Sequence, residues 1–212
     1  MTKARFRRRK DDRPSEITAA AMDAFAEHGY DATPVASVAE RAGVSKGLLY
    51  RYFNTKEDLF KAVVRRFIVP KVDALQAAVA STELSAEEFL RGPFLDFAKQ
   101  IPRSRARFVL RLMIAEGYKH PDLTRWYWEH VASHGLAALQ QLIERGVQNG
   151  EFRPSALERF PQLLLSPVIL SVIWTLVFQR HQKLDTDAFI EAHIDLLLSA
   201  IRAEGISPDT AP

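Results

Sequence analysis

The sequence of this 212-residue chain predicts an all-α fold. The alternation of apolar and polar residues that marks half-buried strands is nearly absent. Apolar residues recur instead at helical spacing, Pro and Gly are sparse within these periodic segments, and helix-capping signals precede several of them. We expect about nine helices. The length allows one sizeable core or two small domains that share a helix.

The first three expected helices are short and closely spaced. The first spans residues 15–28 and ends at Gly29. Thr33 as N-cap, with Pro34 at the first helical position, predicts the start of the second helix. Ser45 caps the third helix.

The fourth expected helix is long and bridges the N-terminal part to the rest of the chain. Thr55 and Asp58 resemble a capping box at its start. The helix runs to about residue 80, with a bend at Pro70 because proline has no N–H to donate. The expected domains are a disordered basic arm at 1–13, a three-helix domain at 14–60, a larger C-terminal helical domain at 61–205 and a tail at 206–212.

The C-terminal half is expected to hold five more helices. Capping boxes at Ser85 with Glu88 and at Ser155 with Glu158 begin the fifth and eighth helices, and Asp185 or Thr186 begins the ninth. Gly92 and Pro93 disturb the fifth helix, which stops before Pro102. The sixth helix is expected at residues 104–118 and the seventh at residues 121–149.

The eighth helix contains residues 160–179, which carry no charged side chain. Its length is enough to span a bilayer, but it includes two prolines and several polar residues. A helix that is apolar on all sides also results when one face packs on its own domain and the other on a partner subunit, and we favour this reading. The residues expected at the dimer interface are Leu165, Ile169, Val172, Ile190, Ile194 and Leu197.

The charge is concentrated at the N-terminus. The first ten residues contain six Lys or Arg and no acid, in a chain whose formal net charge is only +3, so the remainder is net acidic. A basic arm of this kind follows a phosphate backbone or enters a minor groove, although a solubilising or membrane-bound tail has the same composition. No apolar segment follows the basic residues as in a secretory signal, and no cysteine is present, which fits a reducing compartment.

Residues 35–52 carry the spacing of a DNA-binding helix-turn-helix. Ala39 is small where the second helix crosses, and Gly43 stands where the chain must reverse with positive φ. The accompanying apolar positions are Val38, Ala42, Val44, Leu49 and Tyr52. An ordinary helical corner with glycine in its turn is the alternative that this spacing leaves open.

The run GYDATPVASVAERAGVSKGLLYRYFNTKEDLF resembles the N-terminal signature of the tetracycline repressor (TetR) family of bacterial transcription regulators, over about residues 14–62. Residues 115–153, with EGYKHPDL and NGEFRP, are similar to the family's ligand-binding domain. The resemblance implies a cytoplasmic homodimer that binds a palindromic operator in double-stranded DNA and releases it when a small molecule enters the C-terminal domain. Repression is the family's usual effect, and a few members activate. Leu48 departs from the pattern, since the family often has Thr there.

The third helix begins at Ser45 and is expected to enter a major groove about 12 Å wide with its N-terminal end toward the bases. Lys46 then reaches a phosphate or a guanine edge, and Gly47 lets the backbone approach the DNA. Leu48 is placed to contact a thymine methyl group.

Five further residues are candidate DNA contacts. The family pattern points Tyr50 toward the DNA, whereas Tyr52 is either a phosphate contact or partly core. Arg51 is either a phosphate clamp or simply exposed. Thr33 and Lys56 each lie at a helix N-terminus that offers free N–H groups to a phosphate, with plain capping or solvation as the alternative.

The expected effector site is a cavity lined by large residues of the C-terminal helices, with ordinary core packing as the alternative for each residue. The candidates are Phe94, Phe97, Phe108, Met113, Trp126, Tyr127, His130, His134 and Trp174. Their aromatic character favours an apolar or aromatic effector. His130 and His134 are four residues apart, with Glu116 and Glu129 nearby, but two histidines alone are a weak metal signal, so we expect neither a metal nor another cofactor.

Other functions are less well supported by the sequence. We find no glycine-rich phosphate loop, nucleophile elbow, HExxH motif or convergent carboxylate pair, so we do not expect an enzyme. A membrane-associated helical adaptor would use residues 160–179 and the basic arm, and we expect no membrane partner. A nonspecific DNA-binding protein would bind with an affinity that falls steeply with salt and barely varies with sequence.

Overall fold

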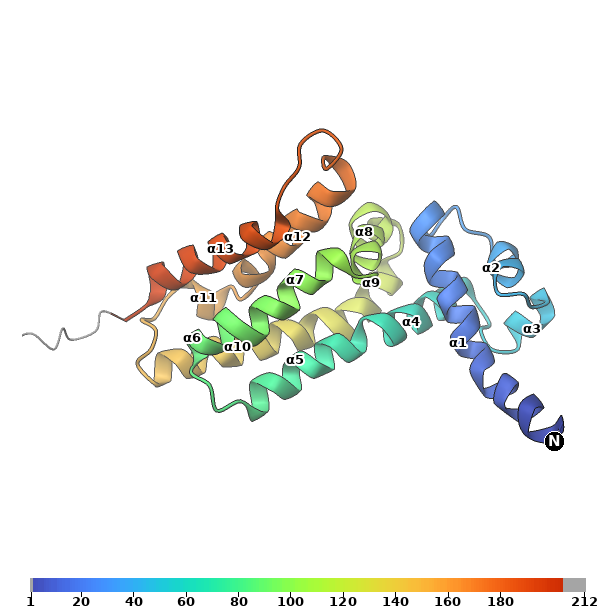
Figure 1. The fold of residues 1–212 in the computed structure, drawn as a ribbon, viewed down its shortest axis with the longest axis horizontal. Coiled ribbons are helices and arrows are strands. Elements are labelled where there is room, and N and C mark those ends of the chain that lie inside the picture. Colours follow the sequence, from blue (N-terminus) through green and yellow to red (C-terminus); the bar gives the residue numbers. More distant parts are fainter. Residues whose placement is uncertain (1, 204–212) are drawn as a thin grey trace, which may run out of the picture. The chain divides into compact units, whose positions relative to one another are not determined.

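The computed structural model describes residues 2–203, with side chains from residue 13 onward (Figure 1). Helices form the regular structure of this part of the chain, apart from an isolated antiparallel bridge between Phe152 and Arg202. The predicted all-α fold class is therefore confirmed. The expected tail at 206–212 lies outside the described residues.

The described residues form two compact units. Unit 1 comprises the chain up to Val72 together with Arg105–Val131, and unit 2 comprises Asp73–Ser104 and the chain from Ala132 onward. The segment 105–131, which the sequence groups with the C-terminal domain, thus packs with the N-terminal helices. The cause is a direct contact of α8 (Ala106–Glu116) with α1 (Thr2–His28), described below.

Unit 1 is built around an aromatic cluster. Phe25, Tyr30 and Phe60 have ring centroids between 5.5 and 5.9 Å apart. The helices around it are α1 (Thr2–His28), α2 (Val35–Arg41), α3 (Lys46–Tyr50), α4 (Lys56–Phe67), the start of α5 (Val69–Ser81), α8 (Ala106–Glu116), a 3-10 turn (Gly117–Lys119), α9 (Pro121–Tyr127) and most of a π-helical turn (Trp128–Ala132).

The first helix begins earlier than expected, at Thr2 instead of near Ser15. It continues through Pro14, whose carbonyl accepts a hydrogen bond from Thr18 Oγ1 at 2.6 Å. Lys and Arg, which are frequent before Pro14, are favourable helix formers, whereas Pro14 lacks the N–H of one backbone hydrogen bond. The side chains of residues 1–12 lie outside the description, and the DNA-binding role of the basic arm stays a prediction.

The fourth expected helix is divided into α4 and α5. Its start is as predicted, because Thr55 and Asp58 form a complete capping box. The break falls at Ile68, two residues before Pro70, and reflects the hydrogen bond that Pro70 is unable to donate. The predicted disturbance near Pro70 is thus an interruption between two helices, two residues earlier than expected.

Unit 2 contains the rest of α5, α6 (Ala86–Phe89), a π-helical turn (Leu90–Phe94), α7 (Leu95–Arg103), α10 (Ser133–Gln148), α11 (Ala156–Arg159), α12 (Gln162–Val177) and α13 (Thr186–Ile201). The capping boxes at Ser85 and Ser155 are present as predicted, and the Asp185 side chain caps α13. α7, α12 and α13 contact one another (Figure 1).

Several helices expected to be continuous are interrupted. The disturbance predicted at Gly92 is the π-helical turn after α6, but α7 then runs through Pro102 to Arg103. The seventh expected helix is split by the π-helical turn between α9 and α10, and the eighth is split near Pro161 into α11 and α12. In the described part of the chain no helix is both long and apolar enough to cross a membrane.

The NGEFRP segment locks the end of α10 to the end of α13. Gly146 leaves space for the buried ring of Phe152, because a Cβ at this glycine would lie 2.6 Å from Phe152 Cε2. Arg153 N–H donates to Ile201 O at 2.8 Å, and the Arg153 Nε group donates to Ala200 O at 2.9 Å. The buried residues of α13 are Ile190, Ile194, Leu198 and Ile201.

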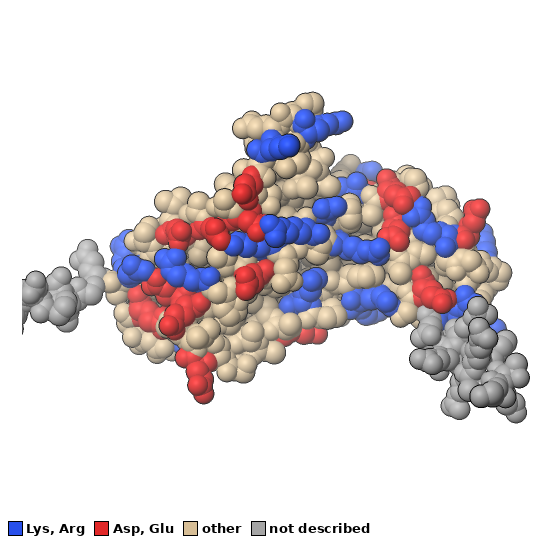
Figure 2. Space-filling model, viewed as in Figure 1, with Lys and Arg blue, Asp and Glu red and all other residues tan. Residues whose placement is uncertain are grey.

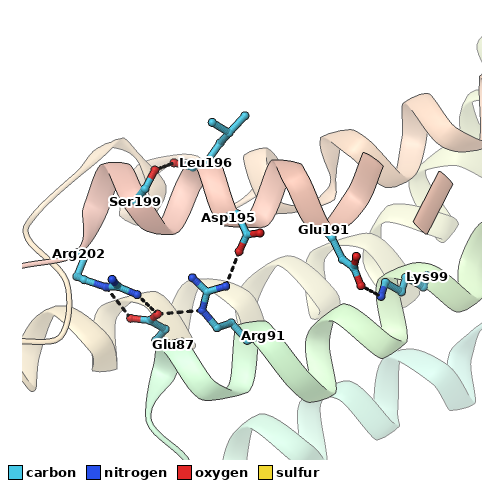
Figure 3. Close-up of polar contacts among 8 residues, drawn as sticks. All are labelled: Glu87, Arg91, Lys99, Glu191, Asp195, Leu196, Ser199 and Arg202. Atoms are coloured by element: carbon cyan, nitrogen blue, oxygen red, sulfur yellow. Dashed lines mark hydrogen bonds and ion pairs between the residues drawn. The ribbon is translucent and has the colours of Figure 1, made fainter. Parts of the chain in front are cut away.

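A ladder of ion pairs joins α13 to α6, α7 and the turn between them (Figure 3). Its pairs are Arg103 with Asp187, Lys99 with Glu191, Arg91 with Asp195, Arg91 with Glu87 and Arg202 with Glu87. Basic and acidic side chains alternate over this part of the surface (Figure 2). The contact with Arg202, and then that with Arg91, lowers the pKa of the Glu87 carboxyl below its usual value.

Candidate nucleic-acid interface

α2 and α3 form a helix-turn-helix with the geometry that the sequence predicts. Val38 and Ala39 of α2 and Leu49 of α3 are buried, so the two helices pack through small and apolar side chains. Gly43 has φ +63° in the turn, a conformation that favours glycine. Val44 N–H donates to Ala39 O at 3.0 Å and closes the corner.

The start of α3 is fixed by its cap. Ser45 Oγ accepts a hydrogen bond from Leu48 N–H at 3.1 Å, which confirms the predicted N-cap. Because Leu49 points into the core, the residues around it face outward. Ser45, Lys46, Gly47, Tyr50 and Arg51 are exposed, and Leu48 and Tyr52 are half-buried.

The exposed face of α3 combines cations with an aromatic hydroxyl. Tyr50 is 40 % exposed, and Lys46 Nζ lies 5.9 Å from the centroid of its ring. Among the side chains from residue 13 to 203, no acidic group forms an ion pair with Lys46 or Arg51. This face is therefore free to meet phosphates and base edges.

The structure corrects the prediction for Thr33. Its side chain is fully buried, and its hydroxyl lies 2.6 Å from Gly29 O and 3.2 Å from Ala24 O. The N-cap of α2 is Pro34, and no side chain caps it. Thr33 thus ties the end of α1 to the following loop and has no surface to offer a phosphate, because its hydroxyl is used internally.

Lys56 faces the loop between α1 and α2. Its Nζ donates to Asp31 O at 3.0 Å and lies 4.7 Å from the centroid of the Tyr30 ring. Burial lowers the pKa of this amine below its usual value. Lys56 supports the loop, and its predicted phosphate contact stays a prediction.

The residues predicted to line one effector cavity are divided between the two units. Phe108, Met113, Trp126, Tyr127 and His130 belong to unit 1, whereas Phe94, Phe97, His134 and Trp174 belong to unit 2. Within unit 1 the His130 ring stacks on Trp126 with centroids 4.6 Å apart. Within unit 2 the rings of Phe94 and Phe97 are 6.4 Å apart. Their assembly into a single site stays a prediction.

The metal alternative gains no support. In the part of the chain that the structure describes, no group of three or more His, Asp or Glu side chains is arranged to hold an ion. His130 Nδ1 instead lies 2.9 Å from Trp126 O, one turn earlier.

Five of the six residues predicted for dimerisation are buried or pack against the core of unit 2. Val172, Ile190 and Ile194 are buried, and Leu165 and Leu197 pack against the same core. Ile169 is half-buried. The sequence did not separate the inward from the outward residues of α12, because this helix is apolar all round and its pattern does not show which side faces the core. The dimer interface itself stays a prediction. On α12, on α13 and in the segments directly before and after α12, the exposed large apolar residues are Phe160, Leu163, Leu170, Val177, Phe178 and Leu196.

The structure shows two residues, not identified from the sequence, that support the end of α1 and the loop before the helix-turn-helix. Arg111 and Glu116 of α8 bond to the end of α1 and to the loop after it. No local pattern reveals such contacts, because their partners lie more than 80 residues away in the chain.

This fold and this interface define an all-α helix-turn-helix DNA-binding protein. Comparison with known proteins identifies the family. The family model "Bacterial regulatory proteins, tetR family" matches residues 17–63, and "Tetracyclin repressor-like, C-terminal domain" matches residues 85–197. The chain belongs to the TetR family of bacterial transcription regulators, whose members are DNA-binding proteins and not enzymes.

Three relatives illustrate this relationship. The "Fatty acid metabolism regulator protein" of Bacillus subtilis is 29 % identical over 205 residues, which is 91 % of this chain and 98 % of the relative. The transcriptional repressor AcnR of Corynebacterium glutamicum is 30 % identical over 138 residues, which is 65 % of this chain and 68 % of the AcnR chain. The crystal structure of FadR from Bacillus subtilis in complex with stearoyl-CoA has a TM-score of 0.73 and 22 % identity, over 89 % of this chain and 99 % of that chain.

Proposed function

We propose that this chain is a repressor that binds a palindromic operator as a homodimer and is released by a small apolar or aromatic effector. The observation that carries the proposal is the exposed face of α3. Lys46, Gly47 and Tyr50 stand there on a helix whose start and inner face are fixed by Ser45 and Leu49. A helix with an exposed cation and a phenol at its surface suits insertion into a major groove.

The test is footprinting of the purified protein on the DNA upstream of its own gene. A symmetric protected site supports the operator, and Lys46→Ala and Tyr50→Ala are each expected to weaken its binding at least about tenfold, the value of one specific contact. Lys183→Ala is the matched control, because Lys183 is an exposed cation of unit 2. Full affinity in both α3 variants, or equal affinity for every duplex, would contradict the proposal and favour nonspecific binding.

The dimer is proposed to form through the exposed sides of α12 and α13. Leu196 is 69 % exposed and points away from the ion-pair ladder (Figure 3). His193 Nε2 lies 2.9 Å from Leu163 O, so α13 meets the start of α12 on this side. Leu163, Leu170 and Leu196 thus offer apolar area on two adjacent helices, as a self-complementary interface requires.

The dimer is tested by placing charge on this surface. Leu170→Glu and Leu196→Glu are expected to give monomers in analytical ultracentrifugation and to weaken operator binding, since a monomer reads only half of a palindrome. Leu84→Glu is the control, because Leu84 is similarly exposed but lies in the loop after α5. A wild-type protein that is monomeric at micromolar concentration refutes this part of the proposal.

The effector class rests on the aromatic residues and on the relatives. Trp126 is buried against the His130 ring and Phe94 against the Phe97 ring, and the FadR relative is described in complex with stearoyl-CoA. An apolar acyl or aromatic compound is therefore the proposed effector, acting in the bacterial cytoplasm. Stearoyl-CoA and free stearate are expected to stabilise the protein against heat and release the operator, whereas coenzyme A alone and a sugar phosphate are not. Release of the operator by coenzyme A or the sugar phosphate, with no response to stearoyl-CoA or stearate, would contradict an apolar or aromatic effector.

A further inference from the structure

The end of α1 is held by side chains of α8, a helix about 80 residues further along the chain. Arg111 Nη2 donates to Ala26 O at 2.6 Å and lies 3.2 Å from Phe25 O. These carbonyls belong to the last turn of α1, where a cation is favourable. Phe25 O also accepts a hydrogen bond from Gly29 N–H at 3.0 Å. α8 thus caps the C-terminal end of α1.

In the loop after α1, the backbone N–H groups of Tyr30 and Asp31 both bond to a single carboxylate. Glu116 Oε1 accepts a hydrogen bond from Tyr30 N–H at 3.1 Å, and Glu116 Oε2 accepts one from Asp31 N–H at 2.7 Å. Hydrogen bonds to an ionised acceptor are stronger than those between neutral groups. One side chain therefore fixes two successive peptide units of the loop between α1 and α2.

Gly29 makes room for this carboxylate. Its φ is +85°, and a Cβ built on it would lie 2.6 Å from Glu116 Oε1. Any other residue at this position would strain the backbone and displace the oxygen that accepts from Tyr30 N–H. Gly29 and Glu116 are thus matched to each other, although they are distant in sequence.

The same loop is held from two other directions. Asp31 Oδ1 lies 2.7 Å from His120 Nε2, and Asp31 Oδ2 lies 3.1 Å from Lys119 Nζ. Lys56 Nζ of α4 donates to Asp31 O. The contacts with His120 and Lys119 lower the pKa of the Asp31 carboxyl. Glu116 therefore holds the backbone of the loop, and Lys119 and His120 hold the side chain of Asp31.

We propose that Glu116 and Gly29 form a positioning pair for operator recognition. The inference rests on the proposed function, because it concerns how α3 is presented to DNA. Glu116 contacts no DNA itself. It fixes the loop that leads into α2, and α2 carries α3 through the packing of Val38, Ala39 and Leu49. Releasing the loop changes the angle at which α3 meets the groove.

The sign of the expected effect separates this role from general electrostatics. Removal of a carboxylate lowers the repulsion between protein and DNA, so a purely electrostatic effect would strengthen binding. The positioning role predicts the reverse. Glu116→Ala is expected to weaken operator binding by about 10- to 100-fold, the cost of losing hydrogen bonds to a charged group. Binding to a scrambled duplex of the same length is expected not to weaken.

The experiment compares the full-length variants on the duplex that the wild-type protein protects. Glu116→Gln covers the case in which Glu116→Ala does not fold. Its amide keeps one acceptor oxygen, but its NH2 group faces a second N–H donor, so an intermediate loss is expected. Glu83→Gln is the charge control, since Glu83 is exposed in the loop before α6. The melting temperature of each variant is measured in parallel, so that loss of folded protein is separated from loss of affinity.

A double-mutant cycle with Gly29→Ala tests the pairing itself. In the wild-type background the new methyl group displaces Glu116, and operator affinity is expected to fall about tenfold or more. In the Glu116→Ala background only the backbone strain remains, so the further loss is expected to be smaller. Additive effects, or unchanged operator affinity in folded Glu116 variants, would overturn the inference while leaving the proposed function intact. A wild-type protein that binds no duplex would overturn both.

Discussion

Gly47 offers a substitution whose effects on stability and on DNA binding are expected to have opposite signs. It lies within α3, and a Cβ built on it meets no heavy atom within 4 Å. Gly47→Ala therefore introduces no clash inside the protein. Replacing a helical glycine by alanine stabilises the folded state by about 0.5–1 kcal/mol, through the reduced conformational freedom of the unfolded chain.

The expected rise in melting temperature is about 1–4 °C for a chain of this size. If α3 lies in the groove with its backbone against the DNA at Gly47, the methyl group pushes the helix outward. Losing one specific contact costs about 1–3 kcal/mol, so operator affinity is expected to fall by about tenfold or more. The two effects are independent, because the methyl group points away from the protein.

The assay combines thermal denaturation with fluorescence anisotropy on the operator duplex. Gly92→Ala is the matched control, because a Cβ at Gly92 also meets nothing within 4 Å and this glycine lies in unit 2, in the π-helical turn after α6. It is expected to leave operator affinity unchanged. Wild-type affinity in folded Gly47→Ala would refute the assignment of this surface to the groove.

Three other predictions concern packing, acid stability and salt dependence. Gly146→Ala is expected to destabilise the protein by about 1–3 kcal/mol in denaturant titrations, because the new methyl group overlaps Phe152; an unchanged midpoint would show that the ring moves freely. The pKa of Glu87 is lowered below 4.5, first by Arg202, so its stabilising effect is present above that pH and is lost as the pH falls through the lowered pKa. Glu87→Gln should therefore lose less melting temperature than the wild type between neutral pH and about pH 3, and equal losses would contradict the shift. Lys46→Ala should reduce the slope of log affinity against log salt by about 1 if Lys46 neutralises a phosphate, and an unchanged slope would leave only a base contact.

The fold class and the DNA-reading element followed from the sequence because both depend on groups close together in the chain. The Ser45 cap bonds to a residue three positions later, and the Thr55 and Asp58 capping box spans one helical turn. The positive φ at Gly43 follows from the tight corner itself. Such contacts form at fixed offsets, so a local pattern is sufficient to predict them.

Only the tertiary structure decided how these elements are supported. Thr33 has the sequence signature of a helix cap, yet it is buried, and its hydroxyl donates to Ala24 O of α1 and to Gly29 O just after that helix. The inward face of α12 was hidden because this helix is apolar on every side. The bond from Glu116 to the loop after Gly29 joins residues far apart in the chain. Sequence periodicity reflects contacts between residues that lie within about one helical turn of each other. Burial and long-range hydrogen bonds depend instead on which surfaces meet once the whole chain has folded.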